Sequence, residues 1–203
     1  MKKTFLFSIK NIPVLFRITA LLLLAIMLAV VFCNIDPESI RVDETLYAEE
    51  ISRAAARHAL PQDLVKALIR RESHFNANAV GSHGEIGLMQ LMPSGAVAEW
   101  ARVKKTLIPS DREVFDVKLN LEIGCWYLAR CIKKWKSYKY GTELALAQYN
   151  AGEKHALRWK PEKKDAPVLP RISWPGTRRY VKYIMNDYHR RVAEHNKNVK
   201  KSR

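Results

Sequence analysis

The amino-acid sequence predicts a mainly helical domain that contains a small irregular or β segment and follows one N-terminal transmembrane helix. Three features lead to this fold class. Apolar residues recur at three- and four-residue spacing through most of the chain, glycine and asparagine interrupt that spacing within residues 74–88, and a long uncharged stretch lies near the start. The 203 residues fit one ordinary domain, and three cysteines are too few for a fold built on disulfides.

Residues 1–33 are predicted to be a membrane anchor or signal segment. Ile18 to Cys33 carries no charge, and the apolar residues from Ile12 to Phe16 extend this stretch toward the roughly 20 that a bilayer requires. Four basic and no acidic side chains lie within residues 1–33, which favours a cytoplasmic N-terminus. We therefore expect a single-pass protein of the cytoplasmic membrane, with its globular part on the periplasmic or cell-wall side.

The sequence leaves open whether this segment is cleaved. A signal peptide requires small residues at its cleavage site, whereas the apolar stretch ends in Val30, Val31, Phe32 and Cys33. An uncleaved anchor is therefore favoured over a cleaved signal. It is also favoured over a lipoprotein modified at Cys33, because Phe32 stands where a small residue is needed.

The net charge of +15 indicates an anionic partner. Without residues 1–33 the chain keeps 31 basic against 20 acidic side chains, a net charge of +11. Nucleic acid is a poor partner outside the cytoplasm, and no nucleic-acid-binding module is recognisable. An acidic cell-wall polymer or the outer face of a membrane fits better, while a generally solvated basic surface would give the same charge.

Residues 34–43 form a predicted polar tether, and the globular domain is expected over residues 44–196. Apolar residues at helical spacing after Glu44 predict its first helix. A second helix is expected from Pro61, which suits a helix first turn, to Ser73. A looped segment with a small hairpin is expected to follow it.

The later helices alternate with loops. A short helix is expected from Pro93 to about Arg102, and a long one from Asp116 to Trp135. Thr142 and Thr177 are each predicted to cap the helix that follows them. The last residues, 197–203, are predicted to form a basic, frayed tail.

Two of the three cysteines lie on the long predicted helix. Cys125 and Cys131 are six residues apart, which places them about 9 Å apart along the helix axis. That separation is too large for a disulfide. We therefore expect both to be buried thiols.

Glu72 is unusual because it occupies the apolar face of its predicted helix. At about 100° per residue it falls in the same arc as Val65, Leu68 and Ile69, so its carboxyl group faces the core. Burial disfavours a charged carboxylate and raises its pKa, which is the property of a general acid at neutral pH. A glutamate that ends the helix and reaches solvent would show the same spacing.

Three blocks of sequence near Glu72 and beyond it resemble the soluble lytic transglycosylase family. They are Glu72-Ser73-His74-Phe75, residues 84–93 with Gly87-Leu88-Met89-Gln90 at their centre, and Gln148-Tyr149-Asn150-Ala151-Gly152. The stretch from Asn120 to Gly124 is also similar, and the order and spacing agree from about Tyr47 to Val192. The resemblance implies a lysozyme-like fold and cleavage of the MurNAc–GlcNAc bond of peptidoglycan.

The resemblance also implies roles for particular residues. Glu72 corresponds to the single catalytic acid/base, and Tyr149 corresponds to the tyrosine that hydrogen-bonds this glutamate. Peptidoglycan glycan strands are the implied partner; no cofactor and no metal are implied, and protein partners are not predicted. The substrate-binding residues that the resemblance implies are Ser73, Gln90, Met92, Tyr149 and Asn150.

A single carboxyl group suffices for the reaction of this family, whereas most glycosidases need two. Protonated Glu72 would give its proton to the glycosidic oxygen, and the N-acetyl group of the substrate would meet the positive charge on the sugar. Ionised Glu72 would then take the proton from the MurNAc 6-hydroxyl as that oxygen attacks the anomeric carbon. The product is a 1,6-anhydro sugar, and no water is added.

The chain departs from the family pattern at several positions. Gly81 replaces a serine that contacts substrate, Gln148 replaces an alanine, and Gly176 stands where many members have a glutamate of the groove. Glu85 falls where a small residue is usual, and it is the one candidate for a second carboxylate. A solvated loop carboxylate is the simpler interpretation of Glu85.

The sequence therefore predicts a membrane-anchored lytic transglycosylase and leaves two alternatives. A catalytically weak scaffold that binds peptidoglycan would not need an acid on a core face, so Glu72, Gln90 and Tyr149 favour the enzyme. A hydrolytic muramidase would use Glu85 or water. The goose-type lysozymes carry carboxylates at the positions of Gly81 and Met92, which disfavours their arrangement here.

Overall fold

The computed structural model describes residues 19, 21–23, 27 and 43–201. The chain divides into two units, Met1–Val42 and Asp43–Arg203. Most of the first unit lies outside the described residues. This includes most of the predicted anchor, residues 1–33, and most of the predicted tether, residues 34–43. Among the residues that the structure does describe, no helix is both long enough and apolar enough to cross a membrane.

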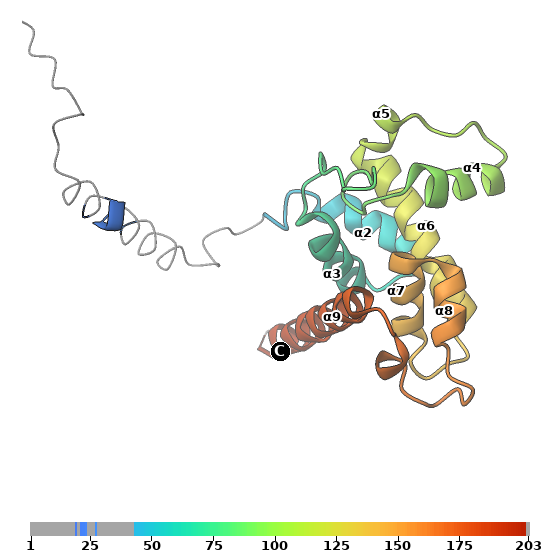
Figure 1. Cartoon of the computed structure of the whole chain (residues 1–203). Helices are drawn as coiled ribbons and strands as arrows, with labels where there is room; N and C mark the ends of the chain where they lie inside the picture. Colours follow the sequence, from blue (N-terminus) through green and yellow to red (C-terminus); the bar gives the residue numbers. More distant parts are fainter. Residues whose placement is uncertain (1–18, 20, 24–26, 28–42, 202–203) are drawn as a thin grey trace, which may run out of the picture. The chain divides into compact units, whose positions relative to one another are not determined.

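The second unit is helical, which confirms the predicted class (Figure 1). Its α-helices are α2 (Ala48–Arg57), α3 (Gln62–Ser73), α4 (Ala98–Lys104), α5 (Asp111–Val114), α6 (Val117–Trp135), α7 (Gly141–Ala151), α8 (Glu153–Trp159) and α9 (Pro175–Lys201). Short π-helical and 3₁₀ segments occupy Pro93–Val97 and Leu169–Arg171. The predicted irregular segment lies between α3 and α4, where isolated antiparallel bridges join Ile86 to Val80 and to Leu91.

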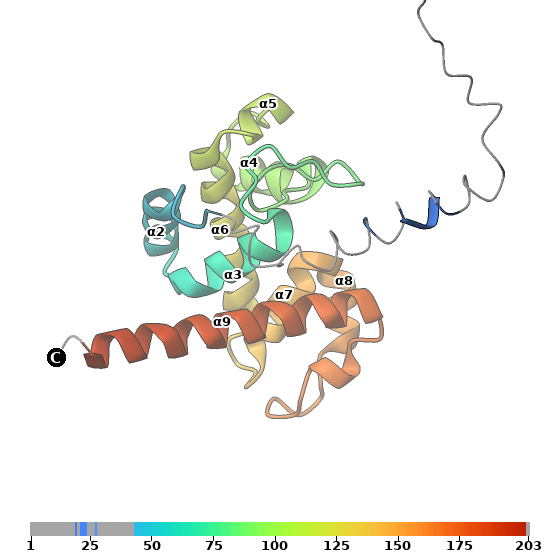
Figure 2. The ribbon, with the colours of Figure 1, turned by 90° about the vertical axis from the view of Figure 1, so that its left-hand side faces the viewer.

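Helix α6 is the centre of this unit. It packs on α2, α4, α5 and α7, while α9 lies across α3 and α7 (Figures 1 and 2). Each fully buried aliphatic side chain contributes about 1.5–3 kcal/mol to the core. The largest of them come from α2, α3, α6, α7 and the loop before α4: Ile51, Leu64, Leu68, Ile69, Leu88, Met89, Leu91, Leu121, Ile123, Leu128, Leu144 and Leu146.

Both predicted threonine caps are wrong. Helix α7 begins at Gly141, one residue before Thr142, and no side chain caps it. Helix α9 begins at Pro175, so Thr177 already lies inside its first turn. The hydroxyl of Thr177 instead donates to the Asn150 side chain at 2.8 Å, which ties the start of α9 to the end of α7.

Two helical segments extend beyond the predicted ones. Helix α8 follows α7 after the single residue Gly152, whose φ of +84° suits glycine and lets the chain turn sharply. Helix α9 runs on to Lys201. The prediction of a frayed tail over residues 197–203 is therefore wrong for residues 197–201. An ion pair between Arg190 and Glu194 at 2.9 Å supports the C-terminal part of α9.

The two cysteines of α6 agree with the prediction. Cys125 and Cys131 are buried and unpaired. Burial raises the pKa of each thiol to about 12, so both stay protonated and act as small apolar side chains.

A cluster of charged side chains fastens α9 to the start of the unit. Arg191 donates to both carboxylate oxygens of Glu44 at 2.7 Å and to Asp187 at 2.9 Å. Arg70 of α3 also reaches Glu44, at 3.0 Å. Because Glu44 lies in the turn before α2, it joins that turn to α3 and α9 instead of beginning a helix.

Asn120 joins the loop before α4 to the central helix. Its side chain is fully buried, accepts the Met89 N–H at 2.9 Å, and donates to the carbonyl oxygens of Ile86 at 2.9 Å and Val114 at 3.0 Å. A Cβ atom on Gly87 would lie 2.4 Å from the Asn120 amide nitrogen, so only glycine allows this approach. Asn120 therefore fixes the backbone of the loop that follows the irregular segment.

The contacts of Asn120 predict a large loss of stability when they are removed. Asn120→Ala leaves a buried N–H and two buried carbonyl groups without this partner, and we expect the free energy of unfolding to fall by about 2–4 kcal/mol. Urea denaturation of the full chain measures this loss. Asn78→Ala, at an exposed position, should change the free energy by less than about 0.5 kcal/mol. Equal effects of the two substitutions would contradict the role of Asn120.

Candidate active site

A cavity of about 680 Å³ lies beside the C-terminal end of α3. It is bordered by the irregular segment, the loop that Asn120 fixes, and side chains from α6 and the end of α7. The lining residues are Arg71, Glu72, Gly81, Ser82, Glu85, Gln90, Leu91, Met92, Gly95, Ala96, Tyr127, Tyr149, Asn150, Ala151 and Gly152.

The structure brings five of the six predicted site residues to this cavity: Glu72, Gln90, Met92, Tyr149 and Asn150. Ser73 lies behind the lining, where its buried hydroxyl donates to the Leu88 carbonyl oxygen at 2.8 Å. Ser73 therefore holds the end of α3 against the loop that carries Gln90.

Glu72 is placed by the way α3 ends. His74 and Phe75 both adopt left-handed backbone, with φ of 51° and 62°, so the chain turns away directly after the last helical turn. Ser73 and Phe75 are buried on either side of this turn. The side chain of Glu72 is consequently left at the cavity wall instead of being covered by the next turn of a helix.

The hydrogen-bond partner of Glu72 differs from the predicted one. Tyr180 of α9 donates its hydroxyl to Glu72 Oε1 at 2.5 Å. Tyr149, the predicted partner, instead donates to the Met89 carbonyl oxygen at 2.9 Å, and its ring packs 5.5 Å from that of Tyr127. The assignment of Tyr149 as the donor to Glu72 is therefore wrong, because its hydroxyl is used to hold the loop.

Sequence reasoning missed Tyr180, although the sequence contains a signal for it. Tyr180 begins the apolar stripe of the last helix and is 2% exposed. A buried phenol requires a hydrogen-bond partner. Glu72 is the polar side chain on the apolar stripe of α3, and α3 packs on α9, so pairing the two stripes would have suggested this contact.

The two carboxyl groups of the cavity have opposite pKa displacements. Burial raises the pKa of Glu72 to about 7, and the nearby Glu85 charge adds to this rise, while the Tyr180 hydrogen bond and the Arg71 charge oppose it. Partial burial also acts to raise the pKa of Glu85. Hydrogen bonds from its own and the His83 backbone N–H, together with the His83 ring, outweigh that effect, so the pKa of Glu85 lies below its ordinary value.

These displacements define what the cavity can do chemically. Near neutral pH, Glu72 is divided between its protonated and ionised forms, so it can either give or take a proton. Glu85 is ionised at the same pH. Within the described part of the chain, no three His, Cys, Asp or Glu side chains lie close enough together to hold a metal ion.

Gln90 and Asn150 are held in place by other parts of the chain. Gln90 has left-handed backbone, with φ of 46°, and its amide nitrogen donates to the carbonyl oxygens of Ala79 at 3.2 Å and Gly87 at 2.9 Å. The side-chain oxygen of Asn150 accepts a hydrogen bond from the Thr177 hydroxyl. Met92 adds a partly exposed apolar surface to the same wall. The cavity therefore offers fixed polar groups beside an apolar face.

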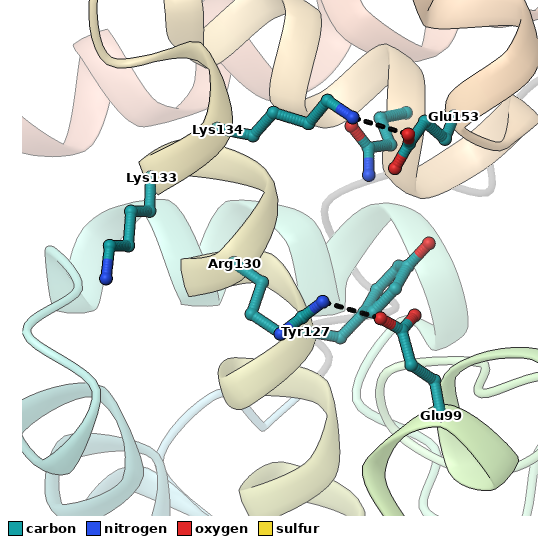
Figure 3. A pocket seen from close by; sticks show the side chains of 7 residues that line it. Glu99, Tyr127, Arg130, Lys133, Lys134 and Glu153 are labelled. Atoms are coloured by element: carbon teal, nitrogen blue, oxygen red, sulfur yellow. Dashed lines mark hydrogen bonds and ion pairs between the residues drawn. The ribbon is translucent and has the colours of Figure 1, made fainter. Parts of the chain in front are cut away.

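A second cavity of about 420 Å³ shares Tyr127 with the first (Figure 3). Arg130 of α6 pairs with Glu99 of α4 at 2.7 Å, and Lys134 of α6 pairs with Glu153 of α8 at 2.5 Å. In Figure 3 the Arg130–Glu99 pair lies at the Tyr127 side chain, and the Lys134–Glu153 pair lies farther toward the top of the view. They join the central helix to the elements at both ends of this cavity.

Gln148, which replaces a usual alanine, lines the second cavity and has a structural partner. Its buried side-chain oxygen accepts the indole N–H of Trp135 at 2.8 Å. The hydrogen bond satisfies a tryptophan donor that α6 would otherwise bury alone. This departure from the family pattern therefore stabilises the contact between α6 and α7.

Comparison with known proteins confirms the resemblance that the sequence blocks carry. A family model described as the Transglycosylase SLT domain matches residues 49–168. Membrane-bound lytic murein transglycosylase E of Buchnera aphidicola subsp. Acyrthosiphon pisum is 37% identical over 90 residues, which cover 44% of this chain and 41% of that protein. Its counterpart in Buchnera aphidicola subsp. Baizongia pistaciae is 28% identical over 153 residues, 73% of this chain and 72% of that protein.

Solved structures of lytic transglycosylases share the fold. The lytic transglycosylase Slt of Pseudomonas aeruginosa, solved as an inactive mutant, matches 79% of this chain with a TM-score of 0.66 and 25% identity. The 70 kDa soluble lytic transglycosylase of Escherichia coli matches 72% with a TM-score of 0.62 and 26% identity. The matches span 26% and 24% of those longer chains. The lysozyme-like fold that the resemblance implies is thereby confirmed.

The surroundings of Glu72 predict how its carboxyl group titrates. In the full chain labelled with ¹³C-glutamate, the Glu72 carboxyl signal should titrate with a pKa of about 7. Tyr180→Phe removes a hydrogen bond that favours the ionised form, so the midpoint should rise by about one pH unit. Tyr183→Phe changes a more exposed tyrosine of the same helix and should leave it unchanged. A Glu72 midpoint near 4.5 in the unmodified chain would contradict this account.

Proposed function

The chain belongs to the transglycosylase SLT domain family, and from this premise we propose that it is a membrane-anchored peptidoglycan lytic transglycosylase. It cleaves the β-1,4 bond between MurNAc and GlcNAc and forms 1,6-anhydroMurNAc, with Glu72 as the single acid/base of that reaction. The observation that carries the proposal is the carboxyl group of Glu72 at the cavity wall, with its pKa raised to about 7.

The first step needs a proton donor at the glycosidic oxygen. Burial keeps a large fraction of the Glu72 side chains protonated near neutral pH. An exposed glutamate with a pKa near 4.5 would be almost fully ionised at that pH. As the bond from the anomeric carbon to the leaving oxygen breaks, the proton passes to that oxygen. The N-acetyl group of the substrate can meet the charge that develops on the sugar.

The second step needs the same group as a base. After giving up its proton, the Glu72 carboxylate keeps the hydroxyl of Tyr180 as a donor, and the charge of Arg71 also favours the ionised form. The carboxylate then accepts the proton of the MurNAc 6-hydroxyl as its oxygen bonds to the anomeric carbon. Tyr180 acts here through Glu72, as a positioning residue that favours the form reached after the first step.

The remaining wall of the cavity suits a glycan. Sugar rings have polar edges and apolar faces, and the wall offers the Gln90 and Asn150 amides beside Met92 and the Tyr149 ring. We assign these four residues to substrate binding. Ser73 supports the site from behind through its hydrogen bond to Leu88.

Anchoring by residues 1–33 completes the proposal. The uncharged stretch from Ile18 to Cys33 and the basic residues before it support a location of the family domain outside the cytoplasmic membrane. The net charge of +11 on the rest of the chain favours an acidic cell-wall polymer there. The relatives in Buchnera aphidicola bear the words membrane-bound in their names, which supports the same location.

The proposed role of Glu72 predicts the loss of activity in one variant. The full chain incubated with purified peptidoglycan should release fragments ending in 1,6-anhydroMurNAc, identified by mass spectrometry. Glu72→Gln should lower the release at least about 100-fold, because the amide cannot give or take the proton. Glu162→Gln, at an exposed position, is the matched control and should keep the rate of the unmodified chain.

The pH dependence of the unmodified chain gives a second check, measured as the rate of fragment release at a series of pH values. Because the first step needs protonated Glu72, the rate should fall about tenfold per pH unit above a pKa of about 7. A Glu72→Gln protein as active as the Glu162→Gln control would refute the proposal.

The proposed anchor predicts a location and a mass. In cells that express the full chain, the protein should remain in the membrane fraction after an alkaline wash, because a spanning helix resists such extraction. Its intact mass should correspond to the uncleaved chain. Deletion of residues 1–33 should remove it from the membrane fraction. A product of the full chain that begins after residue 33 would show a cleaved signal instead.

A further inference from the structure

A tight turn in the irregular segment carries the second carboxylate of the cavity. The Gly81 N–H donates to the Glu85 carbonyl oxygen at 2.8 Å, and the Gly84 N–H donates to the Gly81 carbonyl oxygen at 3.1 Å. The bridge between Val80 and Ile86 closes this turn at its base. Gly84, with φ of +85°, lets the chain reverse.

The side chain of Glu85 folds back over Gly81. The His83 backbone N–H donates to Glu85 Oε2 at 2.9 Å, and the His83 ring lies 3.4 Å from Oε1. A Cβ atom on Gly81 would lie 2.1 Å from Glu85 Oε2, which is closer than any side chain allows. The carboxylate therefore occupies the space that a side chain at position 81 would fill.

Gln90 brings a second acceptor to the same space. Its side-chain oxygen would lie 2.8 Å from that Cβ atom on Gly81. Its amide nitrogen donates to the carbonyl groups of Ala79 and Gly87, which leaves the oxygen as an acceptor beside Gly81, and Gln90 and Gly81 both line the cavity. Because both oxygens lie this close to one point beside Gly81, they are near enough to each other for one water molecule on the cavity side to donate a hydrogen to each.

A water molecule held in this way has both hydrogens engaged and its lone pairs free. Glu85 is ionised at neutral pH and can take one of the two protons, while Glu72, on the wall of the same cavity, is protonated in part. Two carboxyl groups, one protonated and one ionised, are the pair that glycosidases use to hydrolyse a glycosidic bond.

We propose that Glu85 is a second catalytic carboxylate, which activates water at the Gly81–Gln90 side of the cavity and gives the protein a hydrolytic activity beside the transglycosylase reaction. This inference rests on the proposed function, because it uses the same substrate and the same acid. Glu72 gives its proton to the glycosidic oxygen, and the bond from the anomeric carbon breaks. Glu85 takes one proton from the water, whose oxygen bonds to the anomeric carbon, so the product is a reducing MurNAc end.

The two reactions compete for the same species, the MurNAc sugar whose anomeric carbon has lost its bond to the leaving oxygen. The 6-hydroxyl of MurNAc closes the anhydro ring within the sugar, whereas the water held by Glu85 and Gln90 comes from the cavity. Glu85 therefore sets the ratio of reducing to anhydro ends, and this ratio distinguishes a catalytic role from a structural role in the turn. Loss of a purely structural contact would lower both products together.

The ratio can be measured with the full chain on purified peptidoglycan in water enriched in oxygen-18. Mass spectrometry separates the two products, since a hydrolysed end is heavier than an anhydro end by one labelled water. The unmodified chain should give both ends, with the label in the reducing ends.

Glu85→Gln should lower the reducing fraction at least about tenfold. Gly81→Ala should lower it too, because the Cβ atom that it adds displaces the Glu85 carboxylate. Glu162→Gln is the control for an unchanged ratio.

Each outcome decides a separate claim. If the unmodified chain gives anhydro ends alone, or if Glu85→Gln keeps the same reducing fraction, Glu85 does not activate water and this inference is overturned while the proposed function stands. If neither kind of end is released, or if Glu72→Gln releases as much as the unmodified chain, the proposed function fails, and the inference fails with it.

Discussion

The structure depends on the way three helices hold one short loop, residues 86–90, by its backbone. Asn120 of α6 binds the Ile86 carbonyl and the Met89 N–H, Ser73 of α3 binds the Leu88 carbonyl, and Tyr149 of α7 binds the Met89 carbonyl. A loop that lies between packed helices would otherwise bury unpaired polar groups, which costs about 1–3 kcal/mol for each. These hydrogen bonds remove that cost, and they fix the loop relative to the helix that carries Glu72. The position of Gln90 at the end of the loop, and the room for Glu85 in the preceding turn, follow from this arrangement.

A second constraint comes from the far end of the chain. Helix α9 lies across α3 and α7, and Arg191 with Glu44 and Asp187 fastens it to the beginning of the unit. The same helix brings Tyr180 to Glu72 from a position 108 residues later in the sequence. The carboxyl group is thereby shielded from water on one side and given a single strong donor. Burial and this hydrogen bond act on its pKa in opposite directions, and burial is the larger effect.

Most of the helices and the location of the site could be predicted from the sequence, whereas helix α8 and the partners of individual side chains could not. The apolar stripe of α3 identified Glu72 because a helix turns by a fixed angle per residue, and this is a local property. The partner of Glu72 depends on which helix packs against that stripe, so spacing within α3 could not separate Tyr149 from Tyr180. Thr177 was misassigned for a similar reason, since its hydroxyl bonds to Asn150 of another helix. Gly81 and Glu85 are unusual one at a time in the sequence, and their relation is visible only where the turn brings one over the other.

The central claim is that the Glu72 carboxyl group meets the glycosidic oxygen of a MurNAc–GlcNAc bond. A crystal structure of the Glu72→Gln protein with a bound MurNAc–GlcNAc oligomer tests it most directly, because the amide preserves the shape of the side chain without the chemistry. The account predicts that the side-chain nitrogen at position 72 lies about 2.6–3.2 Å from one glycosidic oxygen, with Gln90 and Met92 against the sugars on the same wall. An oligomer bound in the cavity with every glycosidic oxygen out of reach of residue 72, or bound elsewhere on the protein, would contradict it.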